Sequence, residues 1–290
     1  MVIDGKFERL TDFMGAFGIY SNRSANFLIE DGKAVFPLLT DRGKEFIQYM
    51  NRLYTEGLVS PEFLVDKEAM QKMISGNGFM MSMNWVEIVR QMDAFHEKNP
   101  GGKLEYIAPP VGKNGEQGHL SQTLVNTTWI VPKTSEDKTY DCVAFLEKCN
   151  ADEEIVNRIC LGEEGVHYQK DGGEIKTLPA FADITYKGYY SRVILDSKWD
   201  DYANKLEGFD DPIAFAEQYK KTNEIFYAPF DIPASGSSNA QLQQTILDGV
   251  MEMIVKGYSD EKFEELKAKF DAENGNKILE EYQEWYDAQS

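Results

Sequence analysis

The sequence has few of the residues on which catalysis and metal binding usually depend. Its 290 residues include three histidines and three cysteines. The histidines lie far apart, without the i, i+4 spacing of a helical metal-binding pair. A Gly-x-Ser-x-Gly nucleophile motif, a phosphate-binding loop and a Gly-x-Gly-x-x-Gly dinucleotide motif are missing. We therefore expect no catalytic residue, no metal and no cofactor.

Positive charge is also scarce, because 30 Lys and Arg stand against 49 Asp and Glu, for a net charge of −19. Nucleic-acid binding and adsorption to anionic membranes both require a basic surface, so neither is expected. Long apolar runs are lacking, so no membrane-spanning helix is expected. The start, Met1–Lys6, lacks the apolar core of a signal peptide, which fits a cytoplasmic protein or one without its leader.

The odd number of cysteines argues against a complete disulfide framework. All three fall within helical patterns, where a free cysteine is usually a small buried apolar residue. The alternative is a bridge between Cys149 and Cys160.

Apolar residues make up 42% of the chain, enough for a large core, and the length predicts two domains or lobes. Hydrophobic spacing predicts a helix-rich α/β fold with short strands between the helices. Asp31-Gly32 predicts a hairpin over Leu28–Phe36, and Thr40 and Gly57 should begin and end the next helix. Further helices are expected at Asn84 to about His96, at Ser135–Cys149, from an Asn150/Glu153 capping box to Gly162, at Gln241–Lys256, from Ser259, and around Trp285.

The middle of the chain contains two β-prone segments, Leu104–Pro109 and Thr123–Val131, which predict strands. Between them, Val111–Gly118 is rich in glycine and is expected to form an exposed turn. In the helix that follows, the apolar side chains are expected to point inward: Val143, Phe145 and Leu146.

Aromatic residues provide the most informative functional pattern. Sugars offer an apolar face to flat aromatic rings and hydroxyls to polar side chains. Trp85 lies where a strand is expected to meet a helix, so it could project from the edge of the fold toward a ligand. It could equally fill the core. Acidic pairs such as Glu163-Glu164 and Asp200-Asp201 could serve glycoside hydrolysis, but among 49 acidic residues such pairs arise by chance.

Six segments, in order along nearly the whole chain, have sequence patterns similar to those of corresponding segments in one known family. They include a helix followed by a short helix, glycine, an apolar strand and tryptophan, and a Gly-x-Glu-Gly-x-x-Tyr turn. The segments are Phe17-Gly18, Asp31–Lys33, Leu53–Phe63, Ile74–Trp85, Gly162–Tyr168 and Tyr282–Asp287. Together they resemble family 1 extracellular solute-binding proteins, most closely the lipoprotein branch that feeds oligosaccharide ABC importers.

This resemblance implies a type II periplasmic-binding-protein-like fold, mostly its C-terminal lobe. Residues 1–103 would begin that lobe, residues 104–164 would cross into the N-terminal lobe, and residues 165–290 would return. The family's signal peptide, lipid-anchored cysteine and substantial N-terminal lobe have no match here, so the chain resembles a C-terminal portion. The full-length protein would be an extracellular, cell-surface lipoprotein, attached to the membrane only through an anchor that this chain lacks.

The resemblance also implies a binding function without catalysis. An oligosaccharide would lie in the cleft between the lobes, stacked on the tryptophan that matches Trp85, and the ABC permease subunits would be the protein partners. The loop Phe226–Ser238 would face the same cleft. The candidate ligand-binding residues are Trp85, Asn84, Trp129, Phe226, Tyr227 and Asp231. The alternatives are a glycan-active hydrolase or lyase, and a truncated lobe that binds no ligand.

Overall fold

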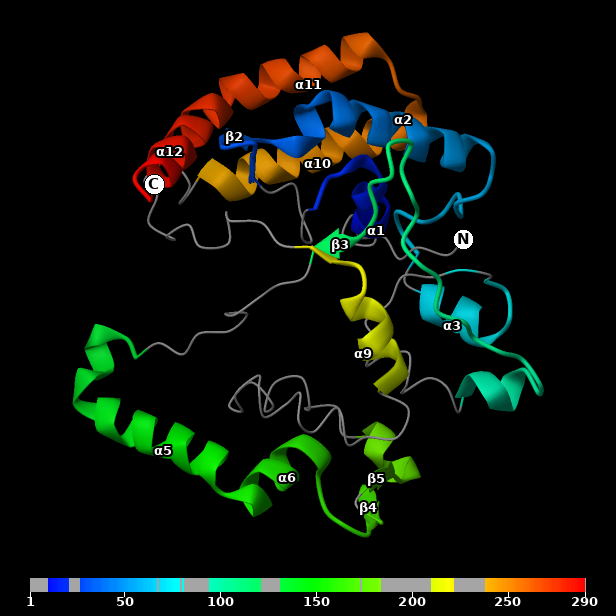
Figure 1. The fold of residues 1–290 in the computed structure, drawn as a ribbon, viewed down its shortest axis with the longest axis vertical. Coiled ribbons are helices and arrows are strands. Elements are labelled where there is room, and N and C mark those ends of the chain that lie inside the picture. The colour runs from blue at the N-terminus through cyan, green and yellow to red at the C-terminus, as the bar shows by residue number, and fades with distance from the viewer. Residues whose placement is uncertain are drawn as a thin grey trace. The chain divides into compact units, whose positions relative to one another are not determined.

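The structure is a computed structural model that describes residues 10–20, 27–66, 68–78, 80, 94–120, 131–172, 174–183, 210–221 and 238–289. Contacts divide the chain into two compact units (Figure 1). Unit 1 comprises residues 1–83, 93–123 and 218–290, and unit 2 comprises residues 84–92 and 124–217. These boundaries report contacts within this chain. The expected lobes were defined by resemblance to a known family and not by contacts. Their division at residues 103 and 164 therefore stays a prediction.

Unit 1 contains the predicted hairpin. Strands β1 (Leu28–Glu30) and β2 (Lys33–Val35) pair antiparallel, with Ile29 opposite Ala34. Asp31 and Gly32 have φ angles of 50° and 75°, the left-handed geometry that a tight hairpin turn of this kind requires. The Asp-Gly prediction is therefore confirmed.

Helix α2 (Asp41–Thr55) begins and ends as the sequence predicted. The Thr40 hydroxyl accepts a hydrogen bond from the Gly43 backbone N–H, which satisfies one of the unpaired donors of the first turn. Gly57 follows the helix with a φ of 71°. The inward face of α2 buries Phe46, Ile47 and Met50.

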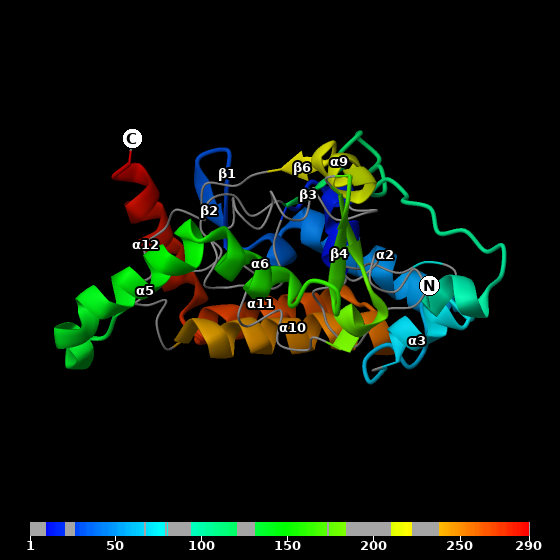
Figure 2. The same ribbon diagram turned by 90° about the horizontal axis from the view of Figure 1, so that it is seen from below.

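Helix α10 (Ser238–Lys256) packs against α2 and against helix α11 (Asp260–Ala272), as Figures 1 and 2 show. Ser259 caps α11 by accepting from the Lys262 backbone N–H, which confirms its predicted role. Apolar residues from these helices and the hairpin form one continuous core. Its fully buried members include Leu38, Phe46, Ile47, Phe63, Leu242, Ile246, Val250 and Ile278.

Helix α12 (Gly275–Asp287) closes over the hairpin. The Gln283 side chain accepts from the Ala34 backbone N–H (2.8 Å) and donates to the Gly32 carbonyl (2.9 Å). Tyr282 stacks on Phe27 with ring centroids 5.0 Å apart. The predicted C-terminal helix is thus confirmed, and it belongs to unit 1.

Shorter elements complete the described part of unit 1. They are α1 (Thr11–Met14), the 3₁₀ turns η2 (Gly15–Phe17) and η3 (Pro37–Leu39), α3 (Ala69–Ile74), and a parallel pair of β3 (His119–Leu120) with β6 (Lys220–Lys221). The predicted strand at Leu104–Pro109 is wrong for this structure, because residues 102–112 have no regular secondary structure. No described strand pairs with that segment, and a strand needs a partner for its backbone groups.

Unit 2 contains α5 (Thr139–Ala151) and α6 (Glu153–Leu161), followed by a hairpin of β4 (Tyr168–Asp171) and β5 (Glu174–Thr177). Its other described elements are η4 (Lys133–Lys138), η5 (Pro179–Asp183) and α9 (Asp210–Glu217). The cap of α6 differs from the prediction: Asp152, not Asn150, accepts from the backbone N–H groups of Glu154 and Ile155. Its carboxylate lies one residue before the helix, where an N-cap acts.

The prediction that the apolar side chains of α5 point inward is wrong for two of them. Val143 is 56% exposed and Phe145 is 58% exposed, whereas Cys149 near the end of the helix is buried. Helix α6 contacts α5, and it leaves the earlier turns of α5 open to solvent.

Cys149 and Cys160 are free thiols, so the alternative prediction of a disulfide bond between them is wrong for this structure. Among the helices that the structure describes, none combines the length and apolar character needed to cross a bilayer. The predicted strand at Thr123–Val131 lies, apart from its last residue, outside the described residues.

A buried carboxylate anchors the start of α3. The Asp66 side chain, only 3% exposed, accepts from the Glu68 backbone N–H (2.8 Å) and from Lys72 Nζ (2.7 Å). These interactions, above all the hydrogen bond from Lys72, lower the pKa of Asp66. The side chain thereby fixes the segment that leads into α3.

This geometry predicts a pH-dependent contribution to stability. Because the pKa of Asp66 is lower in the folded state, the stabilisation is present above about pH 4, its unfolded pKa, and is lost as the pH falls through the folded value. Asp66→Asn should cost about 1–3 kcal/mol of unfolding free energy near neutral pH, and the difference from the unmodified chain should shrink in acid. Urea unfolding followed by circular dichroism measures both.

Glu62 provides the matched control. Its carboxylate lies 3.9 Å from Lys72 Nζ, and its side chain is 75% exposed. Glu62→Gln should change the urea midpoint little at any pH. A loss in Asp66→Asn that is the same at neutral and acid pH would contradict the assignment.

Candidate functional site

The six residues predicted to bind ligand all lie outside the described residues: Asn84, Trp85, Trp129, Phe226, Tyr227 and Asp231. The structure therefore gives no distances among them, and their common role stays a prediction. The described residues do include several elements that precede or follow the segments containing these six residues.

The segments before and after the predicted ligand loop are both held in unit 1. Residues 222–237 follow β6, whose Lys220 is opposite His119 of β3, and they precede α10. The His119 backbone N–H also donates to the Tyr219 carbonyl at 2.9 Å. Residues 222–237 thus follow a paired strand and precede the helix that packs against α2.

The segment that precedes Trp85 also starts from an ordered anchor. Asn99 donates to the carbonyl of Ile74, the last residue of α3, at 2.7 Å and to the Phe95 carbonyl at 2.9 Å. One side chain thus links the end of α3 to the helical turn at residues 94–98 that follows the undescribed segment.

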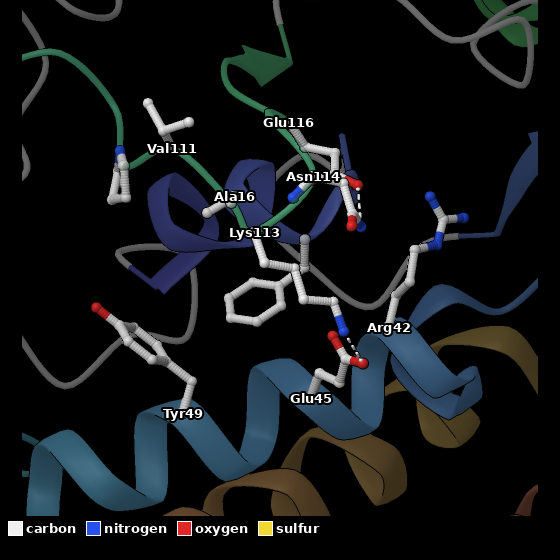
Figure 3. Close-up of a pocket in the computed structure, with 11 residues that line it drawn as sticks. Ala16, Arg42, Glu45, Tyr49, Val111, Lys113, Asn114 and Glu116 are labelled. Carbon is white, nitrogen blue, oxygen red and sulfur yellow. Dashed lines mark hydrogen bonds and ion pairs between the residues drawn. The ribbon is translucent and has the colours of Figure 1, made fainter.

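A pocket of about 320 Å³ lies on unit 1, and the sequence analysis proposed none of its lining residues as a ligand-binding residue (Figure 3). Three segments line it: the turn at η2, the outer face of α2 and the loop at residues 110–116. Its lining residues are Ala16, Phe17, Arg42, Glu45, Tyr49, Pro110, Val111, Gly112, Lys113, Asn114 and Glu116.

Two aromatic rings form the apolar wall of this pocket. Phe17 and Tyr49 have ring centroids 5.6 Å apart and a tilt of 56°. The Arg52 guanidinium lies 5.4 Å from the centroid of the Tyr49 ring, a cation–π geometry. Phe17 also contacts Phe46 edge-on, which connects the pocket wall to the core of unit 1.

The loop at residues 110–116 is fastened to α2 and η2. Lys113 Nζ lies 2.6 Å from Glu45 Oε1, an ion pair visible in Figure 3. At Gly112 the backbone passes so close to Ala16 that a Cβ would overlap the Ala16 carbonyl oxygen. The sequence predicted an exposed turn here. The tip is exposed, but the loop also packs on two other elements, and Gly112 is the sequence signal for that close approach.

Within the loop, Glu116 accepts from the Asn114 side chain (2.9 Å) and from its backbone N–H (3.1 Å). The side-chain hydrogen bond from Asn114 is the main reason that the pKa of Glu116 is lowered. Glu116 is therefore an ionised acceptor that holds the tip of the loop in shape.

Arg42 closes the other end of the pocket. Its guanidinium donates to the Gly18 carbonyl at 3.0 Å and pairs with the Glu30 carboxylate of β1. Burial raises the pKa of Glu30, although the neighbouring Arg42 opposes that shift. The charged groups around the pocket thus form ion pairs and hydrogen bonds with other groups of the protein. These interactions hold the loop in place, and the arrangement does not resemble a catalytic centre.

The Gly162–Tyr168 motif forms a turn that is stabilised by hydrogen bonds between its own residues. The Gly165 N–H donates to the Tyr168 carbonyl (2.7 Å), and the Glu163 N–H donates to His167 Nδ1 (2.9 Å). Glu164 is exposed and lies 3.8 Å from Lys170. Of the acidic pairs considered for hydrolysis, Glu163-Glu164 thus lies in a solvent-facing turn that leads into β4, and Asp200-Asp201 lies outside the described residues.

No group of three or more His, Cys, Asp or Glu side chains that could hold a metal ion occurs within the described ranges.

Two curated proteins resemble this chain in sequence, whereas no family model matches it. An uncharacterised protein from the butB 5′ region of Niallia circulans is 28% identical over 258 residues, 83% of this chain and 98% of that protein. The polygalacturonan/rhamnogalacturonan-binding protein YtcQ of Bacillus subtilis is 24% identical over 291 residues, 93% of this chain and 56% of YtcQ. The chain thus spans little more than half of YtcQ.

Solved structures match the fold over nearly the whole chain. The alginate-binding protein AlgQ2 has a TM-score of 0.70 at 15% identity, covering 99% of this chain and 64% of AlgQ2. An HMO-binding, ABC-transporter-associated solute-binding protein of Bifidobacterium longum infantis has a TM-score of 0.59 at 15% identity, with 99% and 63% covered. These findings confirm the resemblance to solute-binding proteins and the helix-rich α/β fold expected from the sequence.

The docked loop generates a prediction about unit 1. Gly112→Ala places a methyl group against the Ala16 carbonyl, so the loop must move away from η2. We expect a loss of about 1–3 kcal/mol in unfolding free energy and faster amide exchange at residues 110–118. Hydrogen exchange with mass spectrometry and urea unfolding measure the two effects.

Lys113→Ala is the control, because it removes the ion pair without a steric clash. Both partners of that pair are substantially exposed, so the loss should be within about 1 kcal/mol. If the amide hydrogens of residues 110–118 exchange no faster in Gly112→Ala than in Lys113→Ala, the close approach at Ala16 does not hold the loop.

Proposed function

We propose that this chain is the carbohydrate-binding part of an ABC importer, and that it captures an oligosaccharide outside the cell. The observation that carries the proposal is the structural likeness to solute-binding proteins over 99% of the chain, at a TM-score of 0.70 for AlgQ2. Sequence similarity to YtcQ, whose name gives it a polysaccharide-binding function, points the same way.

The proposed ligand class is an oligosaccharide rather than a single sugar. YtcQ is named for polygalacturonan and rhamnogalacturonan, and AlgQ2 for alginate. A similar Streptococcus pneumoniae protein, the ABC-transporter substrate binding protein FusA, was solved in complex with kestose. These ligands differ in charge and linkage, and their shared property is a chain of sugar rings with apolar faces and hydroxyl rims.

The proposed site contains Trp85 and Asn84 together with Trp129, Phe226, Tyr227 and Asp231. A flat indole covers the C–H face of a sugar, and amide and carboxylate groups bind its hydroxyls. Residues 222–237, which include Phe226, Tyr227 and Asp231, follow β6 and precede α10 in the chain, and both of these elements belong to unit 1.

The proposed mechanism is closure of two lobes around the ligand. Residues 1–103 and 165–290 would belong to one lobe and residues 104–164 to the other. A ligand that binds both lobes favours the closed state by its differential affinity, and the permease would select that state. Attachment to the membrane through a lipid anchor outside this chain is part of the same proposal.

We propose no catalytic role for this chain. The similar solved structures are described as binding proteins. A glycan-active hydrolase or lyase and a lobe without ligand binding are the alternatives, and the two experiments below separate them from the leading proposal.

The first prediction from the proposed function concerns Trp85. Trp85→Ala should weaken oligosaccharide binding about tenfold or more, because the stacked ring is lost, and should leave the urea midpoint nearly unchanged. Calorimetric titration with oligogalacturonides, alginate oligosaccharides and kestose measures the affinity.

Trp285→Ala, on α12, is the aromatic control and should leave the affinity unchanged. If instead Trp85→Ala costs about 3–5 kcal/mol of stability and retains affinity, Trp85 is a core residue. Absence of binding to every member of the panel would favour the lobe without ligand function.

The second prediction concerns turnover. Incubation of the chain with the same glycans should yield no new product by chromatography, because the sequence lacks the nucleophile and metal-binding motifs named above and one candidate acidic pair, Glu163-Glu164, lies in an exposed turn. Reproducible cleavage that disappears in Glu164→Gln would replace the binding proposal with the hydrolase alternative.

A further inference from the structure

The pocket on unit 1 has an aromatic wall whose rings are held in place by the protein itself. The ring centroids of Phe17 and Tyr49 lie 5.6 Å apart, and Phe17 packs edge-on against the buried ring of Phe46 at 5.8 Å. The Arg52 guanidinium lies 5.4 Å from the centroid of the Tyr49 ring. Both side chains of the wall are nevertheless only partly buried. A ligand that stacks on this wall therefore loses little affinity to the ordering of the rings.

The polar rim of the pocket keeps hydrogen-bonding groups beyond those that the protein uses. Lys113 Nζ carries three donors, and its described hydrogen bond goes to Glu45 Oε1 at 2.6 Å. The other oxygen of that carboxylate remains an acceptor. Among the described residues, the Tyr49 hydroxyl has no hydrogen-bond partner. Helix α2 supplies Glu45 and Tyr49, and the loop at residues 110–116 supplies Lys113, so these groups meet from two elements (Figure 3).

The charges of the rim compensate one another. Within the described lining, Arg42 and Lys113 are positive, and Glu45 and Glu116 are negative. Lys113 pairs with Glu45, Arg42 pairs with the Glu30 carboxylate, and Glu116 accepts two hydrogen bonds within its own loop. An anion or a cation would have to displace one of these partners. The rim therefore favours a neutral ligand that carries several hydroxyl groups.

The size of the pocket and its lining together define the class of ligand. A volume of about 320 Å³ lies at the lower end of small-molecule sites, which suits one ring better than a chain of rings. A sugar ring offers a C–H face to an aromatic side chain and hydroxyls to charged groups. We propose that this pocket is a second carbohydrate site, which binds a single neutral sugar ring on Tyr49 with its hydroxyls on Glu45 and Lys113.

This second site differs from the one in the proposed function. Its described lining comes from η2, α2 and the loop at residues 110–116, whereas the six candidate residues of the proposed function lie in other segments of the chain. Its ligand is one neutral ring, and its binding requires no closure of lobes. Either proposal can therefore fail while the other holds. Because the sugar contacts both α2 and the loop, its binding stabilises the loop.

Hydrogen exchange of the whole chain tests the proposal, with the methyl glycosides of D-galactose, D-glucose and L-rhamnose as probes at millimolar concentration. We expect exchange at residues 110–118 to slow by about twofold or more with at least one of them. The methyl glycoside of D-galacturonate adds a carboxylate to the galactose ring, and it should protect the loop no better than the galactoside. Absence of protection by all three neutral sugars, or stronger protection by the galacturonate glycoside, overturns the proposal.

Two variants locate the bound sugar. Tyr49→Phe retains the ring and removes the hydroxyl, and Glu45→Ala removes the carboxylate. Each should raise the glycoside concentration that gives half-maximal loop protection, by about threefold to tenfold. The control is Gln48→Ala, because Gln48 is exposed on α2 and lies outside the described lining, and it should leave that concentration unchanged. If Tyr49→Phe and Glu45→Ala both leave it unchanged as well, the pocket is not the site.

A third variant separates this pocket from the site of the proposed function. Loop protection by the glycoside should persist in Trp85→Ala, because Trp85 belongs to a different segment from the lining described above. Loss of loop protection in Trp85→Ala would show that the protection originates at the other site, and it would overturn the second site while supporting the first.

Discussion

The packing of α2 against α10 is the contact on which unit 1 depends. Phe46, Ile47 and Met50 from one helix meet Leu242, Ile246 and Val250 from the other in a continuous buried core. The Asn51 side chain adds a hydrogen bond to the Ile254 carbonyl at 2.8 Å, which fixes the helices along their length. Helices α11 and α12 both contact α10, the hairpin contacts α12, and apolar residues from all of these elements belong to the same buried cluster.

Local signals in the sequence were sufficient for most of unit 1. The Asp31-Gly32 turn, the Thr40 and Ser259 caps and the spacing of apolar residues in α2 all act within a few residues of chain. The errors arose where structure depends on distant partners. Leu104–Pro109 has the composition of a strand without a described partner, and Val143 and Phe145 have the spacing of a buried face without a described cover.

The geometry of the candidate site also could not be predicted from the sequence. Trp85 and the loop carrying Phe226 were chosen by composition and by resemblance to a family, and neither argument supplies a distance. The pocket bordered by Tyr49 and Lys113 could not be found in this way, because its lining residues come from three segments and each is unremarkable alone. Only Gly112, where the backbone passes against Ala16, carried a sequence signal of the close approach.

The distance along the chain between α2 and α10 also bears on synthesis. Asn51 and Ile254 are 203 residues apart, so the apolar face of α2 leaves the ribosome long before the helix that covers it. At about 5–20 residues per second, that interval lasts roughly 10–40 s. During this time unit 1 cannot complete its core, and the nascent chain remains a substrate for chaperones and for any export machinery that accepts unfolded polypeptide. The core of unit 1 therefore closes only after α10 has been synthesised.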